Sequence, residues 1–475
     1  MPSGTRRIAV IGGGISGLAA AYFVTRMARQ QGRPVRVDLF ERENRPGGKF
    51  DATRKDGYIV EAGPNGFLDS KPWTLDLVRE LGMEDRLLPS DQAAARRFIY
   101  SRGRLHELKA SPLSFFLGGP LSVSGRLRII GELWAQPTPR GKDTTLAEFA
   151  TRRLGREALE RLLDPMVSGI FAGDPRRMSL RASFPRIAEL EEQYGGLTRA
   201  MLSIAAEKRK AKRRGDEVVG SSGPSGPGGV LTSFLDGVSE LSDRLALHIG
   251  EGLHTGDSVN FLRRGNGGWK IITQEGEVDV DCVILATPSD VSAAILSDAA
   301  PESGAILSRI PYSPMAVVGL GYDIPDLGTP PDGFGYLIPS VEGRRILGAL
   351  WTSSIFPGYR SPPGKFLLRA MVGGARDHDT PFLPDEKLVE MVRGEISATM
   401  GLSARPTFSS IVRWRKAIPL YTVGHLERVE EAEGRLPGGI VLAGNAYRGV
   451  GINDCIRESE KAARSALESL GQQGA

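Results

Sequence analysis

The sequence predicts an α/β fold in which a mainly helical segment separates two strand-containing parts. At the start of the chain, the apolar runs Arg7–Ile11 and Val35–Phe40 flank a helical pattern over Ser16–Gln30, which is a βαβ unit. Residues 91–214 are instead rich in Leu, Arg, Ala and Glu at helical spacing. Strand-like runs then return, and Val280–Ala286 has the pattern of a buried strand.

The composition excludes several classes of protein. The 475 residues include two Cys and five scattered His, so neither a disulfide framework nor a metal site is expected. Lys and Arg number 61 against 56 Asp and Glu, and this net charge of +5 predicts no nucleic-acid partner. No apolar run approaches the length of about 18 residues that a membrane span needs, and the N-terminus lacks the pattern of a signal peptide. We therefore expect a cytoplasmic protein.

Two stretches of the helical segment leave membrane contact open. Pro112–Trp134 is apolar but carries Arg126, Arg128 and Glu132. It is too polar to span a bilayer, yet apolar enough to lie on its surface; a helix packed in a core explains it equally. The basic run Lys208–Arg214 is either a solvated helix end or a contact for anionic headgroups. Peripheral contact with the cytoplasmic face of a membrane is thus one of two predictions for this segment.

A glycine-rich turn follows the first predicted strand and opens the first predicted helix. It has the G-x-G-x-x-G pattern, as Gly12-Gly13-Gly14-Ile15-Ser16-Gly17. Gly14 lets the backbone approach a pyrophosphate, which the N–H groups and the dipole of the helix N-terminus attract. Glu41, with Arg42 beside it, ends the next strand, where a carboxylate accepts hydrogen bonds from ribose hydroxyls. These features predict a Rossmann-like dinucleotide-binding domain.

Further glycine-rich turns favour FAD over NAD. Arg45-Pro46-Gly47-Gly48-Lys49 lies soon after Glu41, and Gly63-Pro64-Asn65-Gly66 forms another turn downstream. A longer, extended cofactor meets the backbone at more than one such turn. The strand-turns Asp281–Pro288 and Ile440–Asn445 agree. Together these pieces resemble the FAD-binding pattern of the flavin amine oxidase superfamily, and they lie near both ends of the chain, so the FAD-binding domain is predicted to be discontinuous.

One block near the end of the sequence resembles a single family within this superfamily. Gly444–Ile456 closely resembles the C-terminal flavin segment of protoporphyrinogen oxidases. Four other stretches look like the same family and occur in family order: Ser168–Asp174, Gly333–Pro339, Met371–Gly374 and Ile418–His425. The chain is most similar to the oxygen-dependent, water-soluble bacterial branch. It carries Asn445 where many other flavin enzymes place Asp, a difference that this family tolerates.

This resemblance implies an architecture and a reaction. We expect a Rossmann-like FAD-binding domain over 1–90, 215–295 and 410–475, a helical, membrane-associated domain over 91–214, and a mixed-sheet substrate domain over 296–409. The implied reaction is the six-electron oxidation of protoporphyrinogen IX to protoporphyrin IX in heme biosynthesis, with oxygen as acceptor and hydrogen peroxide as product. Because the flavin carries the chemistry, no catalytic side chain is expected. A homodimer is the oligomer that the family suggests.

The resemblance also assigns substrate contacts. Arg97 matches an arginine that pairs with a propionate, since a guanidinium can bind both carboxylate oxygens; Arg96 and an ordinary surface role are the alternatives. Gly169 matches a position whose carbonyl faces the pyrrole N–H groups, or else is a helix-breaking glycine. The residues that clamp the macrocycle faces, or are plain core residues, are Leu337, Leu350 and Met371.

The residues assigned to FAD come from all the turns described above and from two further places in the chain. They are Gly12, Gly13, Gly14, Ile15, Ser16, Gly17, Glu41, Arg42, Gly48, Lys49, Gly63, Pro64, Asn65, Gly66, Val259, His425, Gly444, Val450, Gly451 and Ile452. For Asn65, a simple role in the turn is equally compatible with the sequence.

Three other functions are weighed against this one. A coproporphyrinogen III oxidase, which forms coproporphyrin III, shares the fold and most motifs, and the sequence does not separate the two. A generic amine oxidase usually has an aromatic pair beside the flavin, for which Trp351 and Tyr421 are poor substitutes. A carrier protein of related fold that has lost FAD conflicts with the intact glycine turns.

Overall fold

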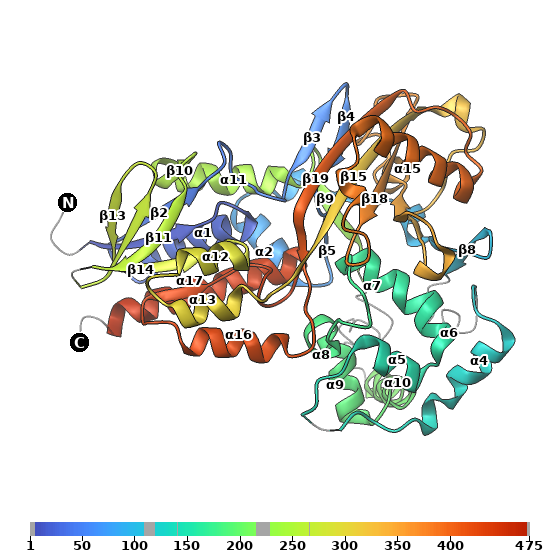
Figure 1. Ribbon diagram of the computed structural model, residues 1–475, viewed down its shortest axis with the longest axis horizontal. Helices are drawn as coiled ribbons and strands as arrows, with labels where there is room; N and C mark the ends of the chain where they lie inside the picture. Colours follow the sequence, from blue (N-terminus) through green and yellow to red (C-terminus); the bar gives the residue numbers. More distant parts are fainter. Residues whose placement is uncertain (1–4, 109–118, 140, 215–228, 266, 473–475) are drawn as a thin grey trace.

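The computed structural model describes residues 5–108, 119–139, 141–214, 229–265 and 267–472 (Figure 1). The fold is mixed α/β, as the sequence predicts. A parallel sheet with its helices forms one end of the molecule, a larger sheet lies at the other end, and a group of helices lies below that larger sheet (Figure 1).

The first part is built on a five-stranded parallel sheet of order β10-β2-β1-β14-β20. Its strands are β1 (Arg6–Ile11), β2 (Val35–Glu41), β10 (Leu253–Thr255), β14 (Cys282–Leu285) and β20 (Ile440–Leu442). Along β1, Ile8 and Val10 pack into one apolar core, whereas Ala9 and Ile11 pack into another. The strand is therefore covered on both faces, which explains its unbroken apolar sequence.

Helices cover one face of this sheet, and a small sheet with further helices covers the other. The first face carries α1 (Ile15–Gln30), α2 (Pro72–Glu80), α11 (Ser239–Ile249) and α17 (Ile452–Gln472). The second carries β11 (Val259–Arg264), β12 (Trp269–Thr273), β13 (Glu277–Val280), α12 (Ser289–Ile295), α13 (Pro301–Leu307) and α16 (His425–Gly434). The first and last helices, α1 and α17, pack side by side.

Short strands lead from this part toward the larger sheet. They form the hairpin of β3 (Ala52–Lys55) and β4 (Tyr58–Glu61), and a three-stranded sheet of β5 (Phe67–Leu68), β9 (Leu231–Phe234) and β6 (Leu87–Pro89). The 3-10 turns η1 (Glu84–Arg86) and η2 (Gln92–Ala95) flank β6, and η5 (Gly250–Gly252) directly precedes β10.

The second part is a seven-stranded sheet of order β19-β15-β18-β17-β16-β7-β8. Its strands are β7 (Arg97–Ser101), β8 (Arg104–Leu108), β15 (Tyr312–Asp323), β16 (Gly335–Leu337), β17 (Ile346–Leu350), β18 (Lys365–Gly373) and β19 (Phe408–Pro419). One pair, β7 with β16, is parallel and the others are antiparallel, so the predicted mixed sheet is present. The helix α15 (Asp385–Met400) packs against one face. Shorter elements are α14 (Thr352–Ile355), η6 (Ile324–Leu327), η7 (Ser340–Glu342) and η8 (Thr380–Phe382).

Two borders of the expected domains differ from this sheet. β7 and β8 lie within 91–214, which was expected to be helical, and β19 lies almost wholly beyond 409. Both segments are placed by strands that are distant in the sequence, because β7 pairs with β16 and β19 pairs along β15. Local patterns in the chain carry no information on such pairings.

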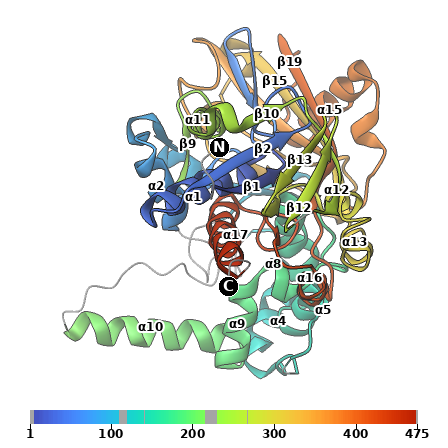
Figure 2. The ribbon, with the colours of Figure 1, turned by 90° about the vertical axis from the view of Figure 1, so that its left-hand side faces the viewer.

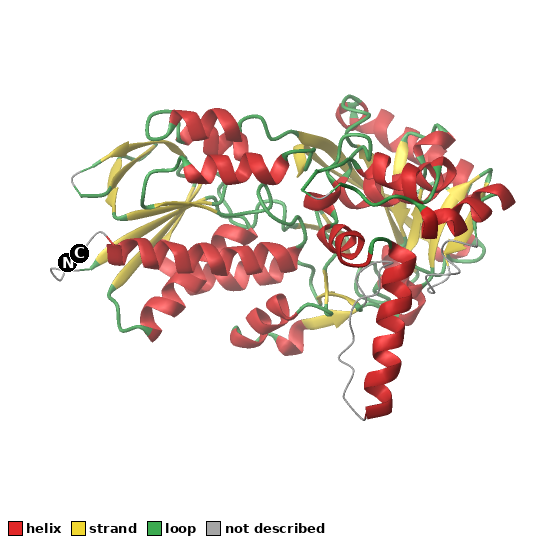
Figure 3. Cartoon of the chain, turned by 90° about the horizontal axis from the view of Figure 1, so that it is seen from below, coloured by secondary structure: helices red, strands yellow, loops and turns green. Residues whose placement is uncertain are grey.

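The third part is built mainly of helices from residues 119–214. Their bounds are α4 (Val123–Ile130), η3 (Gly131–Trp134), α5 (Leu146–Arg153), α6 (Arg156–Ala158), η4 (Leu159–Leu163), α7 (Asp164–Phe171), α8 (Leu180–Ser183), α9 (Pro185–Tyr194) and α10 (Leu197–Arg214). The helical pattern over Arg181–Lys212 is divided among three helices, since Pro185 begins α9 and Gly195, at a φ of 73°, ends it. The long helix α10 projects from the body of the molecule (Figures 2 and 3). No helix among the described residues has the length and apolar character needed to cross a bilayer.

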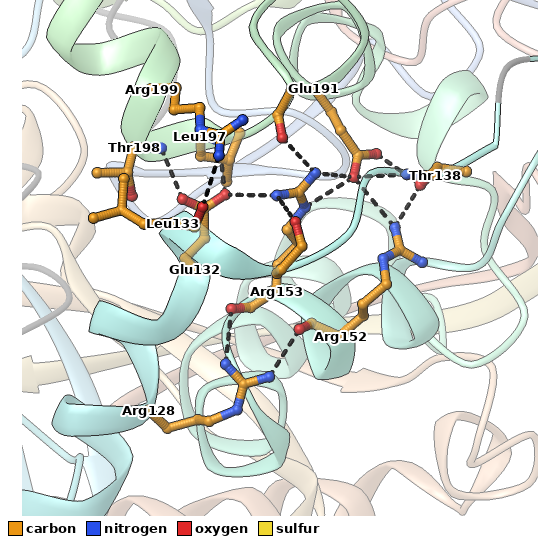
Figure 4. Close-up of polar contacts among 12 residues, drawn as sticks. Arg128, Glu132, Leu133, Thr138, Arg152, Arg153, Glu191, Leu197, Thr198 and Arg199 are labelled. Atoms are coloured by element: carbon orange, nitrogen blue, oxygen red, sulfur yellow. Dashed lines mark hydrogen bonds and ion pairs between the residues drawn. The ribbon is translucent and has the colours of Figure 1, made fainter.

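A buried cluster of charges joins the helices of this part (Figure 4). Arg153, at the end of α5, lies between the carboxylates of Glu132 and Glu191, and all three side chains are at most 4% exposed. Glu132 also accepts hydrogen bonds from the backbone N–H groups of Leu197 and Thr198, at 2.8 and 3.0 Å. A single carboxylate therefore caps the N-terminus of α10 and ties it to η3 and α5.

Candidate functional site

The carboxyl ends of three parallel strands meet at one edge of the five-stranded sheet. A Cβ added to Gly12, after β1, would lie 2.9 Å from the carbonyl oxygen of Ala286, after β14. Gly444, after β20, lies against that same carbonyl and against Ser16. Gly12 has a φ of 105°, which a residue with a side chain rarely adopts. The structure thus brings the first and last glycine turns of the chain together, at the edge where α/β folds bind ligands.

Glu41 is held against the first glycine turn. Its carboxylate accepts a hydrogen bond of 2.6 Å from the backbone N–H of Gly13 and one of 2.9 Å from that of Glu43. The side chain is buried at the end of β2. Its position beside the turn is the one that the predicted contact with ribose hydroxyls requires. Arg42, by contrast, is exposed and pairs with Glu43.

The second glycine pair lies across the first turn. Gly47 donates a backbone hydrogen bond to the carbonyl of Gly13, and Gly14 and Gly47 form an isolated β-bridge. Lys49 follows, with its ammonium 5.6 Å from the centre of the Tyr312 ring. Burial lowers the pKa of Lys49 to about 8, although the nearby carboxylate of Asp290 opposes this effect. A buried ammonium next to the turns is suited to an anionic or hydrogen-bond-accepting ligand.

The third turn, Gly63–Gly66, is held by hydrogen bonds from side chains of the seven-stranded sheet. Trp414 on β19 donates its indole N–H to the carbonyl of Ala62 at 2.7 Å. Arg369 on β18 donates to the carbonyl of Gly63 and to the side-chain oxygen of Asn65. A Cβ on Gly63 would lie 2.3 Å from the carbonyl oxygen of Lys49, so the second and third turns are in direct contact.

His425 supports the last turn from beneath. Its ring is fully buried, stacks on Tyr421 at 4.1 Å, and shares a hydrogen bond of 2.9 Å with the carbonyl of Tyr447. Tyr421 in turn donates its hydroxyl to the carbonyl of Asn445 at 2.6 Å. Burial lowers the pKa of His425 to about 4. His425 and Tyr421 thus hold the backbone of the segment that contains Gly444 and leads to Val450, Gly451 and Ile452, the start of α17.

Four of the predicted substrate residues lie on one face of the seven-stranded sheet. Arg97 pairs with Gly335, Gly335 with Leu350, and Leu350 with Arg369, which forms one row across the strands. Two residues along, Leu337 pairs with Gly348 and Gly348 with Met371, which forms a second row. Because side chains alternate between faces with a period of two, both rows face the same side.

Gly169 lies against this face. It belongs to the last turn of α7, and a Cβ there would lie 2.6 Å from Cδ2 of Leu337. The helix continues to Phe171 and ends at Ala172, at a φ of 49°. Gly169 therefore does not break the helix; it allows the helix to approach the sheet closely. Carbonyls in the last turn of a helix have no partner within the helix and are free to accept other hydrogen bonds.

The two neighbouring arginines differ in their partners. Arg96 forms ion pairs with Glu107 at 3.2 Å and with Asp332 at 2.9 Å. Arg97 has its guanidinium 5.0 Å from the centre of the Phe334 ring and forms no ion pair with the described residues. The Arg97 side chain is exposed overall, and partial desolvation of its guanidinium lowers its pKa. Arg97 is accordingly the better candidate for an external carboxylate.

Some residues of the site are not indicated by any pattern in the sequence. Arg369 is one, although it is the single charge within the apolar run Phe366–Val372; Trp414 and Tyr312 are others. Val259, predicted to contact the cofactor, is buried at the start of β11 in the small second sheet. Ile15 and Pro64 lie within the first and third turns, and Gly17 packs so tightly that a Cβ would lie 1.9 Å from the carbonyl oxygen of Gly12.

The residues present fit a dinucleotide with a flavin. Gly14 begins α1 without a side-chain cap, and a Cβ added to it would meet no protein atom within 4 Å. The first turn of α1 contains no acidic residue that would repel a phosphate. Near the third turn, the buried side-chain nitrogen of Asn65 has no hydrogen-bond partner among the described residues. The site thus offers polar groups along an extended path, from the carboxylate of Glu41, which accepts hydrogen bonds, to the side-chain NH₂ group of Asn65, which donates them.

The chain belongs to the family of flavin containing amine oxidoreductases, whose model matches residues 15–467. It is an FAD-dependent oxidoreductase, and FAD is its cofactor. Two relatives narrow the likeness within that class. The chain is 30% identical to coproporphyrinogen III oxidase of Bacillus subtilis (strain 168), over 99% of this chain and 100% of that one. It is 32% identical to protoporphyrinogen oxidase of Homo sapiens, over 97% and 98% of the two chains.

A solved structure agrees. A crystal structure from Exiguobacterium sp. 255-15, provisionally described as a protoporphyrinogen oxidase, matches with a TM-score of 0.81 and 26% identity, over 98% of this chain and 100% of that one. The resemblance to protoporphyrinogen oxidases that the motifs predict is confirmed.

Proposed function

We propose that the protein oxidises protoporphyrinogen IX to protoporphyrin IX. The observation that carries this proposal is the shared face of Leu337, Leu350 and Met371, with Arg97 on the same face in the row of Leu350. A flat apolar face with a guanidinium at its edge suits a macrocycle that ends in carboxylates. Arg369 holds the third turn, Gly63–Gly66, beside this face by hydrogen bonds. A substrate on the face would meet the flavin ring there.

Each part of the site has a role in this reaction. Arg97 binds one propionate, and the apolar side chains hold the macrocycle faces and exclude water. The carbonyl of Gly169, in the last turn of α7, accepts hydrogen bonds from pyrrole N–H groups. When bound, FAD supplies the electron acceptor for three successive two-electron oxidations, and three molecules of oxygen then take up the six electrons to give three of hydrogen peroxide. The protein itself only binds, orients and shields the substrate.

A second substrate is the tetra-acid coproporphyrinogen III, which would give coproporphyrin III. The relatives from Bacillus subtilis and Staphylococcus aureus, 30% and 29% identical along their whole length, are coproporphyrinogen III oxidases. This observation favours the alternative, whereas the match to human protoporphyrinogen oxidase favours the first substrate.

One assay tests both substrates. Each porphyrinogen is prepared without oxygen and mixed with the purified holoenzyme, and air is then admitted. The fluorescence of the porphyrin product and the formation of hydrogen peroxide are followed together. We expect faster formation of protoporphyrin than of coproporphyrin. The reverse order assigns the second substrate, and no enzyme-dependent fluorescence with either one contradicts the proposal.

We also propose that the helical part contacts a membrane surface without spanning it. Val123, Leu127, Ile130 and Trp134 recur at helical spacing along α4 and η3 and are 52–77% exposed. Such an exposed apolar stripe is typical of a helix that lies in the interface of a bilayer. The part of Pro112–Trp134 before residue 119 lies outside the described residues.

Sedimentation with anionic liposomes tests this contact. The wild-type protein is expected to sediment with the vesicles, and the double variant Leu127→Asp/Trp134→Asp to stay in the supernatant. Arg156→Asp, on an exposed side chain of the neighbouring helix, is the control that keeps binding. Wild-type protein that never sediments excludes the contact. The cytoplasmic location and the homodimer stay predictions, the latter to be checked by sedimentation velocity.

A further inference from the structure

A buried arginine connects the substrate face to the third flavin turn. Arg369 lies on β18 between Leu350 on one neighbouring strand and Gly319 on the other, and it is 4% exposed. Nothing in the reaction proposed above needs a charge at this position. Burying a guanidinium is costly unless each of its donors finds an acceptor, so its partners indicate what it does.

Two of these partners belong to the same turn. One Nη of Arg369 donates to the side-chain oxygen of Asn65, and the other donates to the backbone carbonyl of Gly63. A guanidinium has donors only. The oxygen of the Asn65 carboxamide must therefore face Arg369, which settles an orientation that heavy-atom positions alone leave open. The carboxamide NH₂ group then points away from Arg369.

The NH₂ group of Asn65 is a hydrogen-bond donor without an acceptor among the described residues. The Asn65 side chain is 8% exposed, and its Nδ2 is buried without a hydrogen-bond partner among the described residues. Leaving a buried donor unpaired is unfavourable, so such a group is expected to meet an acceptor when the site is filled. Asn65 lies in the turn that contacts Lys49, in the region assigned to FAD.

The chemistry of the two ligands indicates which one accepts. The centre of a porphyrinogen offers pyrrole N–H and methylene C–H groups, which are not acceptors. The flavin ring offers carbonyl oxygens and ring nitrogens, which are. This step rests on the proposed function, because it takes a porphyrinogen as the other ligand of the site.

We propose that Arg369 is a positioning residue that locks the Asn65 carboxamide with its NH₂ group toward the flavin ring, so that Asn65 donates a hydrogen bond to the flavin and does not serve as a proton acceptor. A donor at this place stabilises negative charge that develops on the ring as electrons arrive. Asn65 thereby raises the midpoint potential of the bound FAD, and Arg369 acts through Asn65.

The charge of Arg369 is offset only in part within the protein, because burial raises the pKa of the neighbouring Glu61 carboxyl to about 7 and this carboxyl lies beside two guanidinium groups. Burial lowers the pKa of Arg369 to about 10, so it stays protonated at neutral pH. Glu61 lies near both Arg369 and a second buried arginine, Arg360, whose guanidinium is 3.6 Å from the Glu61 carboxylate. Arg360 donates to the carbonyls of Phe234 and Leu235 and to Ser233, and it does not contact Asn65. Arg360 is therefore a matched control. It is similarly buried and lies beside the same carboxylate, but it forms its hydrogen bonds with β9 and the residue after it.

The test measures the midpoint potential of bound FAD by dye-equilibrated reduction, followed through flavin absorbance. Asn65→Leu removes the donor without adding charge, and Arg369→Lys keeps the charge but loses the planar fork. We expect Asn65→Leu to lower the equilibrium constant for flavin reduction about tenfold, which is about 30 mV for a two-electron couple. Arg369→Lys should lower it by a smaller factor, and Arg360→Lys should leave it unchanged.

A double-mutant cycle decides whether Arg369 acts through Asn65. None of its four proteins differs in charge, so long-range electrostatic effects cancel. We expect the double variant Asn65→Leu/Arg369→Lys to match Asn65→Leu alone, because there is then no carboxamide to position. Effects of the two substitutions that simply add, or a potential that Asn65→Leu leaves unchanged, overturn the proposal.

A further variant covers the case in which Asn65→Leu does not fold. Asn65→Asp keeps the contact with Arg369 but presents an oxygen to the flavin, so it should lower the potential as well; an unchanged or raised potential overturns the proposal. None of these measurements uses a porphyrinogen. If the wild-type enzyme oxidises neither porphyrinogen while the cycle behaves as expected, the proposed function fails and the role of Arg369 stands.

Discussion

His425 shows how a residue can serve the flavin turn from a distance. Its ring is stacked on Tyr421 and bonded to the carbonyl of Tyr447, so its contacts are with the protein segment that carries the turn. Its Nδ1 is buried and has no hydrogen-bond partner among the described residues. A proton added there would be a buried, unpaired charge, which is why burial lowers the pKa of His425 to about 4.

This lowered pKa makes stability depend on pH. Below pH 6.5 the unfolded chain binds a proton at His425, whereas the folded protein does not until the pH approaches about 4. The free energy of unfolding therefore falls as the pH falls from 6.5 toward 4, by about 2–3 kcal/mol at pH 4.5. Urea denaturation at pH 7 and pH 4.5 measures this loss.

The variant His425→Phe isolates the effect. It keeps an aromatic ring on Tyr421 but has no titrating group, so it should lose less stability than the wild type between the two pH values. Because the bond to Tyr447 is gone, it should be less stable at pH 7 by about 1 kcal/mol. Equal losses in both proteins would show that His425 does not titrate in this range.

Arg97 and Arg96 provide a second contrast at this scale. Arg97→Ala should raise KM for the porphyrinogen about 10- to 100-fold and change kcat little, since a charged hydrogen bond to a propionate contributes to binding throughout the reaction. Arg96→Ala should leave KM unchanged, because Glu107 and Asp332 already occupy its guanidinium. Steady-state kinetics of both variants checks this, and a KM that changes with Arg96 reverses the assignment.

Among the elements, α10 depends on a single buried charge cluster. Arg153→Met leaves Glu132 buried without its cation and leaves Glu191 with Arg152 alone, so we expect the free energy of unfolding to fall by about 3–5 kcal/mol. The loss should be local to the helical part, because the cluster joins η3, α5, α9 and α10 (Figure 4). Hydrogen exchange across 119–214, with flavin absorbance as a check on the remainder, measures it.

The neighbouring helix offers a control for that substitution. Arg156→Met removes a side chain that is 82% exposed and paired with Glu160 one turn away, an interaction that contributes 1 kcal/mol or less. Its exchange rates should match those of the wild type. Similar protection in Arg153→Met and Arg156→Met would show that the buried cluster does not hold α10.

The elements that we propose bind the nucleotide could be predicted from the sequence because their signals are local. The strand, glycine turn and helix of Arg7–Gln30 follow one another directly, and Glu41 lies at the expected distance. The contact of Arg369 with Asn65 joins residues 304 positions apart, and the rows of Arg97 and Leu350 depend on strand pairing. Neither has a local pattern, so the substrate residues are predicted only through family resemblance, and the sequence does not indicate the residues that anchor the third turn.

At the scale of the whole molecule, the first and last glycine turns of the chain meet at the edge of the sheet that we propose binds FAD. Ligand that binds only the folded protein stabilises it by mass action, by about 2.7 kcal/mol at 100 times the Kd. We expect Tm of the apoprotein to rise steadily with FAD concentration in scanning calorimetry. Riboflavin lacks the pyrophosphate and adenosine that the turns at Gly14 and Glu41 would hold, so it should give a much smaller shift. Equal shifts for both ligands would contradict binding by those turns.

The side-by-side packing of α1 and α17 has a consequence for the chain during its synthesis. Leu18 and Val24 of α1 are buried in the same apolar core as Ala463 and Leu467 of α17, more than 400 positions later in the chain. At roughly 5–20 residues per second, a ribosome needs tens of seconds between the two helices. Throughout that interval the apolar side of α1 has no final partner and is available to chaperones. The emergence of α17, and not that of the early glycine turn, therefore sets the earliest moment at which the apolar side of α1 reaches its final packing.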